Sequence, residues 1–248
     1  MIDIHSHVLF DIDDGAEDLQ TSLQLCLDSY RNGCDDLVLT PHFFEYDTVS
    51  DFVNERNEKI EELRKALAEK NIPLRIHPGA ELFLTDDIFD AESLEGLTIN
   101  GSRYLLCEMP LIPFDTRFVT RWFENLIDRG YTPILAHPER YVEVHNDYQL
   151  LEDLIDRGVL FQVNLDSLIG LNGLQPQILA VDLVEQGFAQ FIASDAHDIE
   201  FRHTRLIEKL NELPDEITEE MVEQCMIVNP QKVLNNEEIE IEITDILD

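Results

Sequence analysis

Two histidines, His5 and His7, stand one residue apart in the opening residues MIDIHSHVLF, directly after a short apolar run. Alternate residues of a β-strand point to the same face, so the two imidazoles are predicted to project together. An isolated His-x-His pair is more often two ordinary strand residues, but paired imidazoles are also a common way to ligate a divalent metal ion. Asp13 and Asp14 follow before Gly15, where they could add ligands or simply form a turn.

Other residues that can bind a metal also lie at or just beyond the end of an apolar run, in the stretches LVLTPH, IHPGAE, YLLCE, ILAHPER and FIASDAH. In a parallel barrel the C-terminal ends of the strands converge on one face, where active sites are built. Residues far apart in the sequence would therefore meet in space, although a carboxylate such as Glu108 could instead cap the next helix. The candidate metal ligands are His5, His7, Asp14, His42, Glu81, Glu108, His137, Asp195 and His197.

These candidates offer nitrogen and oxygen donors and no thiolate, a set that suits manganese, zinc or iron. Nine ligands are too many for one ion, because such ions take about four to six, so we expect two or three divalent ions. A carboxylate such as Glu81 can bridge two ions about 3.5–4 Å apart, and a water shared between them loses a proton near neutral pH. The predicted chemistry is therefore hydrolysis by a metal-bridging hydroxide.

Two arginines follow the candidate ligands closely, Arg140 in HPER and Arg202 in DAHDIEFR. Guanidinium groups bind phosphate oxygens in bidentate fashion, so we expect both to hold an anionic phosphate, although pairing with neighbouring acids is the alternative. We leave His77, His145 and His203 out of the site. His77 is expected to pack in the core and His145 to lie on the surface, while it stays open whether His203 contacts the site.

The charge balance and hydropathy restrict the partners. Lys+Arg 17 against Asp+Glu 52 gives a net charge of −35, which repels phosphate backbones, so nucleic-acid binding is not expected. No run approaches the roughly 20 apolar residues that span a bilayer, and no leader pattern opens the sequence, so we predict a cytoplasmic protein without membrane insertion. The four cysteines show no CxxC spacing and are expected to be reduced.

Short apolar runs alternate with amphipathic helical patterns along the chain, which predicts a parallel α/β architecture, and we favour a barrel. The strands are predicted at 2–7, 36–40, 74–76, 104–107, 133–136, 159–163 and 191–193. The helices are predicted at 17–32, 51–70, 116–129, 147–157, 176–187, 200–212 and 218–235, with glycine stop signals at Gly33, Gly130 and Gly158. Residues 1–235 are predicted to form one domain, with residues 236–248 as an acidic extension.

The order and spacing of several motifs resemble the polymerase and histidinol phosphatase (PHP) superfamily, and within it the bacterial metal-dependent tyrosine-protein phosphatases of capsule and exopolysaccharide biosynthesis. The motifs are DIHSH, IDDG, TPH, GAE, CEMP, AHPERY, QVNLDSLIG and SDAH, which together span most of the chain. Two departures fall in loops: Phe10 and Asp11 stand where relatives often carry Pro-Gly, and RHT at 202–204 replaces a common Arg-Pro pair.

The resemblance implies a distorted (β/α)₇ TIM-like barrel with a trinuclear metal centre, for which we expect manganese, with zinc or iron as alternatives. It implies one ion held by His5, His7, Glu81 and Asp195, a second by Glu81, Glu108 and His137, and a third by Asp14, His42 and His197. Arg140 and Arg202 match positions that hold the substrate phosphate, and His42 and Asp195 count among the catalytic residues. The implied substrate is a phosphotyrosine protein, with a bacterial tyrosine autokinase as the expected partner, and an oligomer is possible.

Several alternatives remain. A cysteine-based tyrosine phosphatase needs Cys followed by five residues and Arg, and a P-loop hydrolase needs its glycine-rich motif; neither pattern occurs in the sequence. An amidohydrolase commonly uses a bridging carboxylated lysine, for which no lysine is suitably placed. A histidinol phosphatase or another small-molecule phosphoesterase would share the ligand set, and a non-catalytic phosphopeptide-binding module is the alternative from a different class.

Overall fold

The computed structural model describes residues 1–44, 48–86, 90–112, 115–146 and 148–240. Its strands are β1 (Ile2–Asp3), β2 (Asp36–Leu39), β3 (His42–Phe43), β4 (Arg75–Pro78), β5 (Glu81–Phe83), β6 (Tyr104–Glu108), β7 (Thr132–Ala136), β8 (Leu160–Asn164) and β9 (Ala189–Ala193). Its α-helices are α1 (Leu19–Arg31), α2 (Val49–Glu69), α3 (Val119–Asp128), α4 (Val142–Asn146), α5 (Gln149–Ile155), α6 (Leu165–Leu168), α7 (Leu174–Glu185), α8 (Leu206–Leu210), α9 (Glu219–Glu223) and α10 (Asn229–Leu234). Short 3₁₀ or π turns are η2 (Glu95–Leu97), η3 (Ile99–Gly101), η4 (Thr116–Phe118), η5 (Pro138–Arg140) and η6 (Gln224–Val228).

The strands form two parallel sheets, ordered β1-β2-β4 and β3-β5-β6-β7-β8-β9. The sheets are continuous, because the Gly79 amide donates to the Leu39 carbonyl and the Glu81 amide to the Pro41 carbonyl, at 2.9 and 3.1 Å. β2 and β3 are thus two parts of one path, as are β4 and β5. The parallel bridge between Ser6 and Ala196 brings the chain after β1 beside the end of β9. In the described residues this leaves seven parallel strand paths in a ring, as expected from the sequence.

Side chains inside the ring follow the two-residue period of the strands. The inward apolar residues form one buried cluster. The π turn η6 and α10 close the ring at the end opposite the C-terminal ends of the strands, where Val233 joins this cluster. The cluster consists of Ile2, Ile4, Val38, Ile99, Tyr104, Leu106, Ile134, Ala136, Leu160, Phe191, Ala193 and Val233. Because the same alternation continues past these residues, the next inward positions toward the C-terminal ends are polar: Glu108 on β6, Gln162 and Asn164 on β8, and Asp195 after β9.

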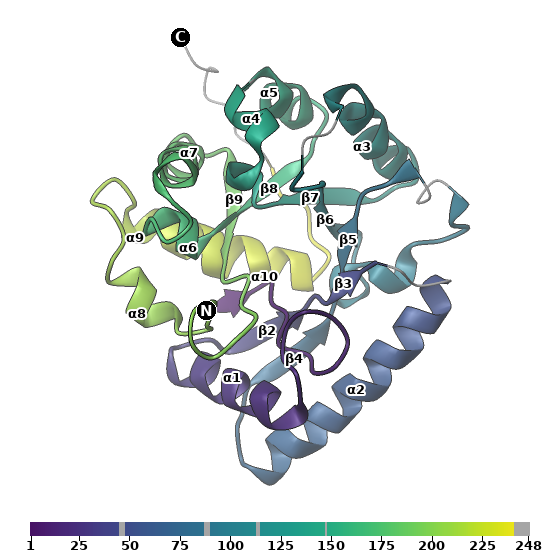
Figure 1. The fold of residues 1–248 in the computed structure, drawn as a ribbon, viewed down its shortest axis with the longest axis vertical. Helices are drawn as coiled ribbons and strands as arrows, with labels where there is room; N and C mark the ends of the chain where they lie inside the picture. Colours follow the sequence, from purple (N-terminus) through teal and green to yellow (C-terminus); the bar gives the residue numbers. More distant parts are fainter. Residues whose placement is uncertain (45–47, 87–89, 113–114, 147, 241–248) are drawn as a thin grey trace.

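The longer helices surround the strands (Figure 1). A larger buried cluster packs between helices and strands, with residues such as Leu25, Leu63 and Phe123. Asp18 caps α1 by accepting from the Thr21 amide, and Thr48 caps α2 by accepting from the Asp51 amide. No helix among the described residues combines the length and the apolar character needed to cross a membrane.

Most predicted elements are present with shifted ends. The glycine stops at Gly33, Gly130 and Gly158 have positive φ after α1, α3 and α5, as predicted. The strand predicted at 2–7 is regular only at Ile2–Asp3, and the chain continues extended to His7. Strands β3 and β5 and helices α4 and α6 were not predicted, because elements of two to five residues carry too little periodicity. Residue 147, the start of one predicted helix, lies outside the described residues.

The helix predicted at 200–212 is wrong in its first half, since α8 covers only Leu206–Leu210. The carboxylate of Asp198 accepts from the amides of Glu200 and Phe201 at 2.7 and 2.6 Å, which folds residues 198–202 into a turn. An aspartate that bonds nearby amides competes with helix formation. The predicted helix 218–235 consists of α9, a π turn and α10.

The predicted boundary between domain and extension stays a prediction, since the structure describes only residues 236–240 of the extension. Asn236 accepts from the Arg103 amide at 2.9 Å, and Ile239 packs against the cluster inside the ring. These contacts hold the beginning of the extension on the barrel.

Candidate metal centre

The nine candidate ligands converge at the C-terminal end of the strand ring. Glu81 lies at the middle, because its two carboxylate oxygens contact four histidines from three different strand ends. Its Oε2 is 3.3 Å from His5 Nε2, 3.2 Å from His7 Nε2 and 3.1 Å from His42 Nδ1. Its Oε1 is 3.1 Å from His137 Nε2. Residues that the sequence separates by more than a hundred positions thus share one carboxylate.

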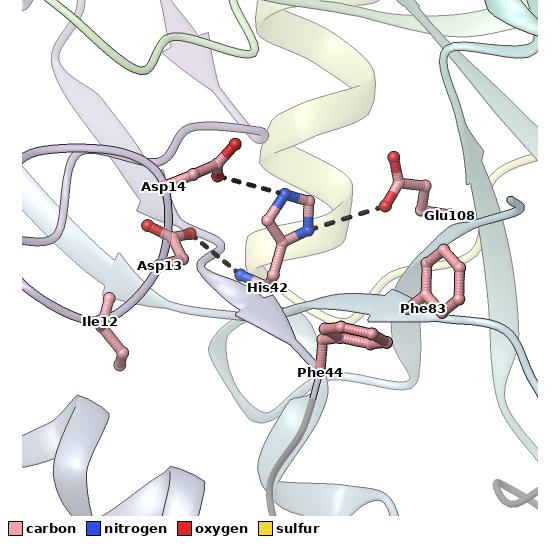
Figure 2. Close-up of a pocket in the computed structure, with 7 residues that line it drawn as sticks. All are labelled: Ile12, Asp13, Asp14, His42, Phe44, Phe83 and Glu108. Atoms are coloured by element: carbon pink, nitrogen blue, oxygen red, sulfur yellow. Dashed lines mark hydrogen bonds and ion pairs between the residues drawn. The ribbon is translucent and has the colours of Figure 1, made fainter. Parts of the chain in front are cut away.

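Seven of the nine candidates form three overlapping groups, two of which include this carboxylate. Close groups of potential ligands are His5 with His7 and Glu81; His42 with Glu81 and Glu108; and His7 with Asp14, His42 and His197. Asp14 reaches both His42 and His197, at 3.5 and 3.4 Å between Oδ1 and the Nε2 atoms. In Figure 2, His42 lies between Asp14 on one side and Glu108 on the other.

Asp195 connects the histidines to both predicted phosphate-binding arginines. Its Oδ1 lies 3.3 Å from His5 Nε2 and 3.5 Å from His7 Nε2. Its Oδ2 accepts from Arg202 at 2.6 Å and Arg140 at 3.1 Å. The side chains of Arg140 and Arg202 are 26% and 37% exposed. Further N–H groups can therefore reach an anion beside the cluster.

Gln162 and Asn164 on β8 set the proton position of His5, a role that the sequence did not reveal. An ionised carboxylate only accepts, so Asn164 must donate its Nδ2–H to Asp195 Oδ2, at 2.7 Å. Its Oδ1 then accepts from Gln162 Nε2 at 2.9 Å, which leaves Gln162 Oε1 facing His5 Nδ1 at 2.7 Å. His5 consequently carries a proton on Nδ1, and its Nε2 is the ring nitrogen that faces the cluster.

Asp13 orients His7 in the same way. Its Oδ2 lies 2.7 Å from His7 Nδ1 and also accepts from the His42 amide at 3.0 Å, while Oδ1 accepts from the Gly15 amide. From the sequence, Asp13 could add a ligand or simply form a turn, and in the structure it bonds the Gly15 amide in a turn and is the partner of a candidate ligand. Gly15 is required there, since an added Cβ would overlap the His7 carbonyl oxygen.

Burial and charge shift the titration of the cluster. Burial and the neighbouring Glu81 charge raise the pKa of Glu108 to about 8. Burial lowers the pKa of His137 to about 4. Burial also disfavours the Glu81 anion, but the charge of His5 and the hydrogen bonds from His137 outweigh it and hold the Glu81 pKa well below its usual range. Uncompensated negative charge is thus unfavourable at Glu108, and a bound cation would reverse that effect.

Two of the candidate ligands adopt left-handed backbone conformations. His137 has φ 36° directly after β7, and Asp195 has φ 50° two residues after β9. Residues with a Cβ adopt this region at a cost of about 1–3 kcal/mol, and such strain gathers at functional sites. The surrounding strands supply the packing that stabilises both conformations.

The excluded histidines lie away from the cluster. His77 on β4 is partly buried, and its Nε2 lies 2.8 Å from Asp36 Oδ1 on β2, which fits packing rather than metal ligation. His145 was expected on the surface, but it is partly buried because its Nε2 bonds the Glu139 carbonyl at 2.7 Å. His203 accepts from the Arg205 amide at 3.3 Å. All four cysteines are free and buried, as expected for reduced thiols.

A ring of parallel strands with histidines, carboxylates and arginines on its C-terminal rim defines a barrel of the metal-dependent hydrolase type. The chain matches the family described as "Capsular polysaccharide synthesis, CpsB/CapC" over residues 1–235, and it belongs to that family.

Named relatives agree with this membership. CapC of Staphylococcus aureus is 34% identical over 244 residues, which covers 96% of this chain and 93% of that protein. Tyrosine-protein phosphatase YwqE of Bacillus subtilis is 33% identical over 245 residues, with 96% and 93% covered.

Solved structures agree as well. A crystal structure from a study of Bacillus subtilis YwqE and Streptococcus pneumoniae CpsB superposes on this chain with a TM-score of 0.88. The two chains are 30% identical, and 100% of both is covered. The study describes these proteins as unique metal-dependent tyrosine phosphatases. A phosphotriesterase from Mycobacterium tuberculosis, at 13% identity and a TM-score of 0.57 over 95% of this chain and 94% of that one, shares the fold.

Proposed function

We propose that the chain is a metal-dependent tyrosine-protein phosphatase that hydrolyses phosphotyrosine at the rim described above. The observation that carries the proposal is the convergence of five histidines and four carboxylates on one rim, beside two arginines held by Asp195. The family membership and the relatives named as tyrosine-protein phosphatases support it.

The proposed ligands fit two or three divalent ions. One ion would be held by His5, His7, Glu81 and Asp195, a second by Glu81, Glu108 and His137, and a third by Asp14, His42 and His197. The Nε2 atoms of His5 and His7 lie 3.2 Å apart and face the same two carboxylate oxygens. Since the Gln162–Asn164 chain holds the Nδ1 proton of His5, Nε2 is the atom through which His5 would bind an ion.

Nitrogen and oxygen donors without thiolate suit manganese, which we propose as the ion, with zinc or iron as alternatives. Divalent ions bound there would supply positive charge to the phosphoryl oxygens and would lower the pKa of a water molecule. Arg140 and Arg202 bind and orient the phosphate through the N–H groups that do not contact Asp195. A tyrosine phosphate also has a better leaving group than a serine phosphate, since a phenolate is less basic than an alkoxide.

The proposed substrate is a phosphotyrosine protein, with a tyrosine autokinase of polysaccharide export as the partner and the cytoplasm as the location. The net charge of −35 disfavours polynucleotide substrates. The extent of the barrel domain, residues 1–235, and of the acidic extension, residues 236–248, belongs to the same proposal.

Phosphate release from a phosphotyrosine peptide by the manganese-loaded protein tests the activity. We expect turnover that a chelator abolishes and added manganese restores. Arg202→Gln should lower kcat/KM about 10- to 100-fold, because a charged hydrogen bond to the phosphate is lost. Arg117→Gln is the control, since this exposed arginine pairs only locally with Asp115. A metal-loaded protein inactive on every phosphomonoester would contradict the proposal.

Two alternatives share the rim and are separated by substrate. A histidinol phosphatase or another small-molecule phosphoesterase would hydrolyse histidinol phosphate or a dinucleotide faster than a phosphotyrosine peptide. A non-catalytic phosphopeptide-binding module would bind the peptide tightly without turnover. Measuring kcat/KM for these three substrates beside peptide affinity therefore distinguishes the three classes.

A further inference from the structure

Two phenylalanines follow two of the candidate ligands along neighbouring strands. Phe83 stands two residues after Glu81 on β5, and Phe44 stands two residues after His42, directly beyond β3. Because side chains two apart on an extended chain share a face, each ring points to the same side as a candidate ligand. His42 pairs in register with Glu81, so the two rings are also neighbours across the strands.

The two rings form one wall of an open pocket. Their centroids lie 5.2 Å apart at 72°, an edge-to-face arrangement. The pocket has a volume of about 400 Å³ and is lined by both rings, Ile12, Asp13, Asp14, His42 and Glu108. Figure 2 shows the two rings together below Glu108, with Ile12 and the aspartates across His42. Phe44 is 54% exposed, so its apolar surface is open to a ligand in the pocket.

The pocket and the arginines lie at different ends of the ligand cluster. Arg140 and Arg202 contact Asp195, whereas the aromatic wall adjoins His42 and Glu108. A ligand with an anionic end over the cluster and an aromatic body would thus have a partner for each part. We propose that Phe44 and Phe83 form the subsite for the aromatic ring of the phosphorylated residue, and so select aryl over alkyl phosphate monoesters.

This inference rests on the proposed function and adds to it a physical basis for substrate choice. An incoming ring would extend the edge-to-face pair and cover the exposed face of Phe44, and aromatic contacts of this kind favour binding about two- to tenfold each. Phosphoserine and phosphothreonine have no ring to place there. Leaving-group chemistry alone would favour phosphotyrosine whether or not the rings were present, so a test must not depend on bond cleavage.

Two phosphonates that cannot be hydrolysed separate binding from leaving-group chemistry. Calorimetry on the manganese-loaded protein should show benzylphosphonate binding about tenfold or more tightly than methylphosphonate. Phe44→Ala and Phe83→Leu should each reduce this preference about threefold or more, without changing the affinity for methylphosphonate. Leucine at position 83 retains an apolar side chain at a partly buried position, and thermal unfolding of each variant confirms that it is folded.

Tyr30→Ala is the matched control, since this tyrosine is 39% exposed near the C-terminal end of α1, outside the pocket. It should leave the preference unchanged. An equal loss of affinity for both phosphonates, or a preference that survives both Phe variants, would overturn the aromatic subsite. Because phosphotyrosine turnover by the wild-type protein is measured separately, failure of the subsite is distinguishable from failure of the proposed function.

Discussion

At the scale of single residues, the two carboxylate oxygens of Asp195 contact different groups of the site. Oδ1 faces the histidines, whereas Oδ2 accepts from Arg140, Arg202 and Asn164. The position of the arginines is therefore coupled to the position of the ligand cluster. Because of these contacts, the pKa of Asp195 lies below its usual range even though burial opposes ionisation.

His137→Ala should separate activity from folding. If His137 binds a catalytic ion, its loss should lower kcat more than about 100-fold, since a bound ion supplies several kcal/mol of transition-state stabilisation. The free energy of unfolding of the metal-free protein should change by less than about 2 kcal/mol. His145→Ala is the control, because His145 bonds a backbone carbonyl rather than the cluster. Comparable losses of activity and stability in His137→Ala would indicate a structural role instead.

Gln162→Leu should remove the constraint on the His5 tautomer. Metal affinity should fall about 10- to 100-fold, the usual effect of losing a hydrogen bond that orients a metal-binding histidine. In the metal-free protein, ¹⁵N chemical shifts of the imidazole should change from a single Nδ1–H form to a mixture of both tautomers. An unchanged tautomer would show that Gln162 does not set the proton position.

The candidate ligands could be named from the sequence because each lies where an apolar run ends. Gln162 lies inside such a run and Asn164 directly after it. Their role depends on which strands are neighbours and on the inward face of β8, neither of which a local pattern reveals. The signal was nevertheless present, since a polar residue at every second position of FQVN is unusual for a buried strand.

At the scale of elements, loops with defined turns carry the site residues, and regular strands position those loops. The loop 10–16 holds Asp13 and Asp14 through the close approach of Gly15 to His7. The turn at Asp198 holds Arg202, and it replaces the first half of a helix predicted from periodicity. Helical periodicity cannot reveal such a turn, because the turn is set by one carboxylate that bonds nearby amides.

Gly15→Ala should displace the loop 10–16 and weaken the contact between Asp13 and His7. We expect metal affinity to fall about tenfold or more and the melting temperature to decrease, since the added Cβ meets backbone atoms that cannot move easily. Glu17→Ala, an exposed change close to the same loop, should do neither. Wild-type metal binding in Gly15→Ala would contradict the role given to this loop.

Asp36 connects β2 to β4 and provides a pH-dependent contribution to stability. Burial opposes its ionisation, but bonds from Arg75 and His77 prevail and lower its pKa. The ionised group therefore stabilises the fold above its ordinary pKa, and the contribution is lost as pH falls through the lowered folded-state value.

Asp36→Asn should lower the free energy of unfolding by about 1–2 kcal/mol at pH 7, and the difference should shrink below about pH 4. Asp35→Asn is the adjacent control, because Asp35 is an exposed partner of the N-terminus and should contribute less than about 0.5 kcal/mol. Denaturant unfolding at several pH values measures both. A difference that stays constant with pH would contradict the ion-pair explanation.

At the scale of the whole molecule, the parallel ring and its polar rim follow from the alternation of strands and helices, which is visible in the sequence. The sequence does not reveal that two strand paths are each broken, one into β2 and β3 and the other into β4 and β5. The breaks occur at TPH and PGA, where proline and glycine interrupt the hydrogen-bond ladder but the chain continues in the same direction. The net charge of −35 attracts cations and disfavours anionic polymers.

The central claim is that the rim side chains hold several divalent ions. Anomalous diffraction from crystals grown with manganese, recorded near the manganese absorption edge, tests it most directly. We predict at least two peaks within coordination distance of the Glu81, Asp195 and His42 side chains. Diffraction that shows no peak among these side chains, with manganese present in the crystal, would contradict the account.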